Sequence, residues 1–245
     1  MLRKPTLVNH AFANKISGTI LIIAASLSFI FYGYCILSLP LGDYPYAGII
    51  VGENAFLALD YLEFGVKLLI KIFLIAAVAC AMERYEHYAN DRQPAYIWIV
   101  SLSLELCLYV RNIAVALINF FSQKEAGLSI NNMDFFMEIF SNVMSIIAFS
   151  LLIAIAVYSS DLLKAKHVLR MTVVTFILSI LFFGNALINL ITLDHNTVSL
   201  LANLILFADG LTVFIPSVII MAGAKKESQV HYTSTDIYIR HHKER

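Results

Sequence analysis

Four charged residues lie at regular intervals within an otherwise apolar stretch of the chain. They are Asp60, Glu63, Lys67 and Lys71. On a helix with 3.6 residues per turn, these positions fall within an arc of about 80°. A charged side chain at the middle of a bilayer costs roughly 2.5–3.5 kcal/mol on insertion scales, so such residues face a bundle interior, pair with one another or mark a pathway. The spacing therefore predicts one charged face on one membrane-spanning helix.

Two further charges, Glu105 and Arg111, lie within the next apolar stretch. A rise of 1.5 Å per residue from the middle of each stretch puts Arg111 at nearly the depth of Glu63. The same reckoning puts Lys71 and Glu105 at a common depth, about 4 Å inward of the membrane midplane. We therefore expect one ion pair at each level, with Lys67 within reach of either acid.

Two more acids, Glu138 and Asp209, bring the intramembrane acids to five against three bases. At least two acids then lack an internal partner, and Asp60 and Glu138 lie close enough to the outer interface to be hydrated. Asp209 is the deepest acid without an assigned partner, and burial disfavours its charged form. Gly210 is adjacent, and Pro216 removes a helix hydrogen bond and favours a kink. These residues predict a proton or cation site beside a hinge.

A structural interpretation of the same residues stands beside the functional one. Buried ion pairs and polar side chains also set the register of neighbouring helices, and proline in a membrane span often produces only a bend. Both interpretations predict the same ion pairs, so the charged face alone does not distinguish a transport pathway from a structural role in helix assembly.

Residue patterns typical of catalysis, metal binding and cofactor binding are absent from the sequence. The three cysteines are isolated, and the seven histidines fall in loops and tails, so facing spans offer no pair of haem ligands. No glycine-rich phosphate loop, paired-histidine zinc helix or nucleophile-elbow motif occurs. We therefore expect no cofactor, no metal site and no enzymatic activity.

The composition indicates a membrane protein. Of the 245 residues, 60% are apolar and 14% charged, and the mean hydropathy is +0.78, whereas a soluble domain has about 45–50% apolar and about 25% charged residues. The net charge is zero, which disfavours nucleic acid as a partner.

Six stretches are long and apolar enough to cross a hydrocarbon core of about 30 Å. They are Ile16–Leu39, Ala55–Met82, Ala95–Phe121, Met133–Tyr158, Leu169–Leu193 and Thr197–Gly223. The sequence thus predicts an all-α integral membrane protein, with a six-span bundle over residues 1–223. Residues 1–15 are expected to form a short polar cytoplasmic segment, and residues 224–245 a polar cytoplasmic tail.

The basic residues outside these stretches predict the orientation. All of them except Lys124 lie before the first span, between spans two and three, around the start of span five or after span six. Because short loops rich in Lys and Arg stay in the cytoplasm, both termini are expected there. Tyr32 and Tyr34 at the outer end and Tyr96 and Trp98 at the inner end are expected to form interfacial aromatic belts.

Two functions remain in competition. The first is a transporter or channel, with a polar pathway lined by the charged residues of spans two, three and six. The alternative is a non-catalytic subunit or assembly factor of a larger membrane complex. Its partners would be the lipid bilayer and either other membrane subunits or a second copy of the chain.

Overall fold

The structure, a computed structural model, is all-helical. It describes residues 7–38, 53–84, 92–125, 132–158 and 207–222, together with positions 170, 173–178, 180, 184 and 204. Within these ranges every residue is helical except Asn14 and Arg92. The predicted all-α fold class is therefore confirmed for the described part of the chain.

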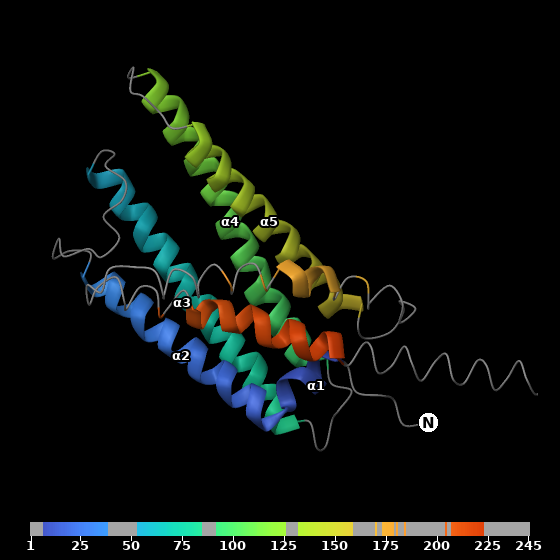
Figure 1. Cartoon of the computed structure of the whole chain (residues 1–245). Coiled ribbons are helices and arrows are strands. Elements are labelled where there is room, and N and C mark those ends of the chain that lie inside the picture. Colours follow the sequence, from blue (N-terminus) through green and yellow to red (C-terminus); the bar gives the residue numbers. More distant parts are fainter. Residues whose placement is uncertain are drawn as a thin grey trace, which may run out of the picture.

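Two antiparallel helix pairs form the body of the molecule. The helices are α1 Leu7–Ala13, α2 Lys15–Ser38, α3 Glu53–Arg84, α4 Gln93–Glu125 and α5 Asn132–Tyr158, followed by an unlabelled helix, Phe207–Ala222. α3 packs against α2 on one side and α4 on the other, and α4 packs against α5. The last helix crosses these pairs near the end of the bundle where α1 lies (Figure 1).

Four helices among the described residues are long and apolar enough to cross a membrane. These spans are Lys15–Leu37, Tyr61–Glu83, Gln93–Glu125 and Phe135–Val157. They correspond to the first four predicted stretches and indicate a multi-pass membrane protein by length and composition. The helix Phe207–Ala222 is a shorter apolar helix within the predicted sixth stretch. Most of the predicted fifth stretch lies outside the described residues.

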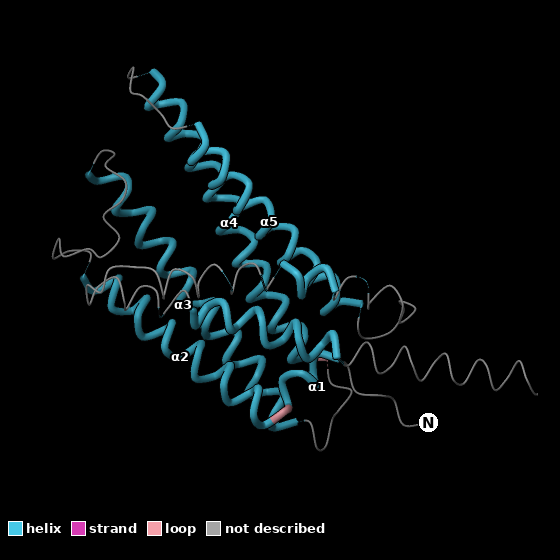
Figure 2. The backbone as a smooth tube through the Cα atoms, in the orientation of Figure 1, coloured by secondary structure: helices cyan, strands magenta, loops and turns pink. Residues whose placement is uncertain are grey.

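A one-residue junction at Asn14 separates α1 from α2 (Figure 2). The side-chain oxygen of Asn14 accepts a hydrogen bond of 3.1 Å from the backbone N–H of Ile16, which satisfies a donor that a helix start leaves unpaired. A Cβ atom on Gly18 would lie 2.6 Å from the carbonyl oxygen of Phe12 and 2.9 Å from the sulfur of Met82. Glycine at this position therefore lets α1 fold back closely onto the start of α2.

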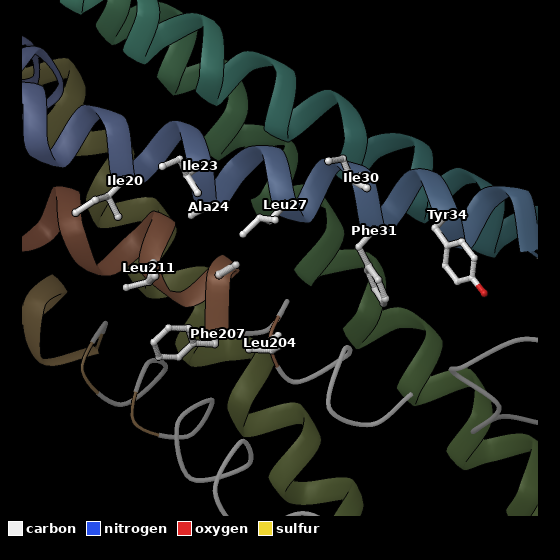
Figure 3. A pocket seen from close by; sticks show the side chains of 11 residues that line it. Ile20, Ile23, Ala24, Leu27, Ile30, Phe31, Tyr34, Leu204, Phe207 and Leu211 are labelled. Carbon is white, nitrogen blue, oxygen red and sulfur yellow. The ribbon is translucent and has the colours of Figure 1, made fainter. Parts of the chain in front are cut away.

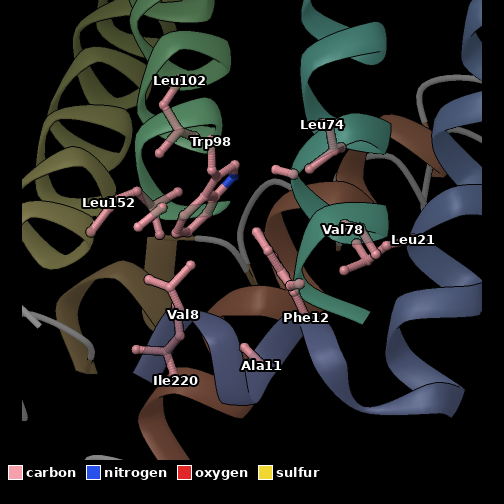
Figure 4. Packing of buried hydrophobic residues seen from close by; sticks show 14 of the residues in the cluster. Val8, Ala11, Phe12, Leu21, Leu74, Val78, Trp98, Leu102, Leu152 and Ile220 are labelled. Carbon is pink, nitrogen blue, oxygen red and sulfur yellow. The ribbon is translucent and has the colours of Figure 1, made fainter. Parts of the chain in front are cut away.

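The core lies at the end of the bundle closed by α1. Val8, Ala11 and Phe12 of α1 are fully buried, and Trp98 of α4 is buried with them. The rings of Phe12 and Trp98 meet edge to face with centroids 5.0 Å apart (Figure 4), an arrangement that the ring quadrupoles favour. Two expectations are therefore wrong. Part of the segment 1–15 belongs to the core instead of forming a polar appendage, and Trp98 packs inside the protein instead of at an interface.

Candidate functional site

One face of α3 carries the charged side chains that the spacing predicted. Glu63, Lys67 and Lys71 all contact charged partners inside the bundle, whereas Leu69 on the opposite face is exposed. Asp60 also lies on α3, but its side chain is outside the described part of the structure. The predicted division of α3 into a charged face and an apolar face is confirmed over the described residues.

The outer cluster consists of Glu63, Lys67 and Arg111. Lys67 Nζ lies 2.9 Å from one carboxylate oxygen of Glu63, and the guanidinium group of Arg111 on α4 binds the other. Arg111 also donates a hydrogen bond of 3.2 Å to the side-chain oxygen of Asn112. The predicted pair of Glu63 with Arg111 is confirmed, and Lys67 is assigned to the same acid.

The inner cluster consists of Lys71, Glu105 and Asp209. Lys71 Nζ lies 2.8 Å from Asp209 Oδ1 and 3.7 Å from Glu105 Oε1, and only 1% of its side chain is exposed. The predicted pair of Lys71 with Glu105 is confirmed. The expectation that Asp209 has no assigned partner is wrong, because the helix Phe207–Ala222 lies against α3 and brings this acid to the lysine.

Tyr32 of α2 connects the two clusters. Its hydroxyl group donates a hydrogen bond to Asp209 Oδ2, and its ring centroid lies 5.1 Å from Lys67 Nζ, within range of a cation–π interaction. Tyr32 is 4% exposed, so its predicted place in an interfacial belt is wrong. No charge pattern in the sequence marks this residue, whose role follows from the helices that surround it.

The register of α4 against α3 is held by a polar contact beside the inner cluster. The hydroxyl group of Ser101 donates a hydrogen bond of 3.1 Å to the backbone carbonyl of Ile70. Ile70 immediately precedes Lys71, and Glu105 lies one helical turn after Ser101. The contact therefore sets the acid on α4 opposite the lysine on α3.

The predicted hinge residues lie within a continuous helix. Helical structure extends from Phe207 to Ala222 through Gly210 and Pro216. The hydroxyl group of Thr212 donates to the carbonyl of Asp209 at 2.7 Å, and that of Ser217 donates to the carbonyl of Val213 at 2.8 Å. Side-chain donors of this kind support a helix around a proline at membrane depth.

Charge is balanced over the two clusters together. The outer cluster holds two bases and one acid, and the inner cluster holds one base and two acids. Each cluster thus carries one excess charge of opposite sign when all six groups are ionised. Glu138 is exposed on α5 and takes no part in the ion pairs found among the described residues.

A separate cavity of about 650 Å³ lies between α2 and the last helix. Its lining is apolar apart from the hydroxyl group of Tyr34, and Phe31, Phe207 and Leu211 are among the residues that face it (Figure 3). The described residues that line the cavity include none of the six charged residues of the outer and inner clusters, so its surface suits apolar groups.

Comparison of the chain with protein-family models, curated proteins and solved structures finds no match.

Proposed function

We propose that this chain is a membrane transport protein whose polar pathway follows the outer and inner clusters. One observation carries the proposal: ionisable side chains from three helices, with Tyr32, form a continuous series of contacts from Arg111 to Asp209. Charged groups at membrane depth must be desolvated, which is costly even when they pair. A single buried polar residue is enough to set a helix register, so a purely structural role does not require this many.

The pathway is best accommodated by six spans with both termini in the cytoplasm. The helix Phe207–Ala222 supplies Asp209 and would form part of the sixth span. The distribution of basic residues favours this topology, since it puts every basic residue outside the spans except Lys124 on the cytoplasmic side.

Ion flux tests the proposal directly. The purified protein is reconstituted into liposomes that contain a pH-sensitive dye, and acidification is followed under an imposed pH gradient. Wild-type vesicles are expected to acidify faster than empty vesicles, and Asp209→Asn is expected to slow the protein-dependent rate at least tenfold. Removing this carboxylate takes away the group that Lys71 and Tyr32 both contact.

A matched substitution on α3 provides the control. Glu83 is exposed near the cytoplasmic end of that helix, and Glu83→Gln is expected to leave the rate unchanged. Wild-type vesicles that acidify no faster than empty ones under any gradient would contradict proton transport along this pathway and favour the alternative function below.

The alternative function is a membrane-embedded subunit or assembly factor of a larger complex. The observation that favours it is the charge balance, because three acids and three bases that neutralise one another also make a stable framework without any flux. Under this alternative, Asp209→Asn changes stability but leaves vesicle acidification at the level of empty liposomes, as in the wild type.

A further inference from the structure

The two acids of the inner cluster differ in how closely their partners approach them. Asp209 has Lys71 Nζ at 2.8 Å from one oxygen and the Tyr32 hydroxyl group on the other. Glu105 has Lys71 Nζ at 3.7 Å, which is beyond a normal hydrogen bond. One ammonium group therefore serves two carboxyl groups, and it lies closer to the aspartate.

Among the residues that the structure describes, the other groups around Glu105 do not replace the missing contact. On α3, the ammonium group of Lys67 is already bound by an acid of the outer cluster. On α4, Tyr109 lies one turn away and is uncharged, and on the last helix Asp209 adds negative charge. On α2, the hydroxyl group of Tyr32 is directed to that aspartate. Residues 141–158 of α5 include no charged side chain.

We propose that Glu105 is the proton-binding site of this protein, and that Lys71 changes partner as the proton binds and leaves. This second proposal rests on the transport function proposed above, and it names the proton as the transported ion. A proton from water joins a carboxylate oxygen of Glu105, so the inner cluster goes from one excess negative charge to none. A metal cation is not expected, because the ammonium group of Lys71 occupies the position between the two acids.

In the structure Lys71 contacts both acids and lies nearer to Asp209. When Glu105 is protonated and neutral, its attraction for the ammonium group falls, and Lys71 is held by Asp209. When the proton leaves, the carboxylate of Glu105 attracts Nζ and weakens its contact with Asp209. Because Asp209 belongs to the helix Phe207–Ala222, loss of the proton loosens that helix from α3. Proton binding is thereby linked to the position of the last helix.

Infrared difference spectroscopy tests the site without requiring transport. The protein in lipid vesicles is titrated with acid, and the carbonyl stretch of protonated carboxyl groups is recorded. The exposed carboxyl groups give one such band in every variant as the pH falls. The wild type is expected to show a second, separate band from Glu105, and this second band is expected to be absent in Glu105→Gln. Asp209→Asn should retain the second band, and so should Glu125→Gln, an exposed substitution on the same helix.

A second variant separates loss of the site from misfolding. Glu105→Asp keeps a carboxyl group and is expected to retain the second band at a shifted frequency and a shifted midpoint pH. If the second band is unshifted in Glu105→Asp, or persists in folded Glu105→Gln, the assignment to Glu105 is overturned. A second band lost in Asp209→Asn but kept in Glu105→Gln would also overturn it and place the proton on the aspartate.

The two proposals fail in different ways. A titrating band that depends on Glu105, together with no flux in wild-type liposomes, would support the proton site and contradict transport alone. Flux that depends on Asp209, with no Glu105-dependent band, would support transport and contradict the proton site.

Discussion

Lys71 is the residue on which the interior of the bundle most depends. Its side chain is 1% exposed, so its ammonium group has almost no contact with the surroundings outside the protein. Removing one partner of a buried ion pair leaves an uncompensated charge, which costs more than the pair itself contributes. The stability of the inner cluster therefore depends on how the lysine divides its interaction between two acids.

A double-mutant comparison measures that division. Lys71→Met is expected to lower the free energy of unfolding by roughly 3–5 kcal/mol. Adding Asp209→Asn should restore more of this loss than adding Glu105→Gln, because the lysine lies 2.8 Å from the aspartate and 3.7 Å from the glutamate. Denaturant unfolding in detergent–lipid micelles gives the three values. Equal recovery by the two double mutants would show that the lysine does not prefer Asp209.

The ion pairs could be predicted from the sequence only as far as depth determines them. Counting residues from the middle of each span placed Glu63 level with Arg111, and the structure confirms that pair. Depth does not determine which helix lies against α3, so the contact between Lys71 and Asp209 was missed. Tyr32 was missed for the same reason, since an aromatic residue near the end of a span is equally typical of a membrane interface.

At the scale of the helices, α1 shows how a short element escapes detection. It has seven residues, too few to be stable alone in water, and its stability must come from packing. Its signal was the spacing of Val8, Ala11 and Phe12, which puts three apolar side chains on one side of a helix. The neighbouring charges in segment 1–15 suggested a polar tail, and only the docked structure shows that these side chains complete the core.

Substitution at the turn tests the docking of α1. Gly18→Ala is expected to lower the free energy of unfolding by roughly 1–3 kcal/mol, as overpacking does, because the added Cβ would overlap the carbonyl oxygen of Phe12. Trp98, the single tryptophan, packs against that residue, so its fluorescence should shift to the red. Gly33→Ala on the same helix is the control, since a Cβ there meets nothing within 4 Å. An unchanged melting temperature and emission in Gly18→Ala would show that α1 is not held by this contact.

At the scale of the whole molecule, the lengths of the helices can be compared with the thickness of a bilayer. α4 has 33 residues, about 50 Å of helix at 1.5 Å per residue, against a hydrocarbon core of about 30 Å. The four described spans were predictable because each is a long apolar run. Most of the fifth predicted stretch and part of the sixth lie outside the described residues.

Cysteine labelling tests the six-span topology. Single cysteines at Ser129 and Ser160 are introduced into a chain whose native Cys35, Cys80 and Cys107 have been replaced. With both termini cytoplasmic, an impermeant reagent added outside is expected to modify the Ser129 position and leave the Ser160 position unmodified. Labelling after membrane permeabilisation controls for accessibility. Modification of the Ser160 position in sealed cells would contradict the six-span topology.

The contact between Tyr32 and Asp209 joins parts of the chain that are 177 residues apart, which has a consequence for biosynthesis. A ribosome adds about 5–20 residues per second, so roughly 9–35 s pass between the synthesis of the two residues. Lys71 likewise enters the bilayer well before the aspartate exists, and Glu105 is the next acid of the network to emerge. During insertion, Lys71 can therefore pair with Glu105 before Asp209 has been synthesised, although its contact with Glu105 is the longer one in the finished protein.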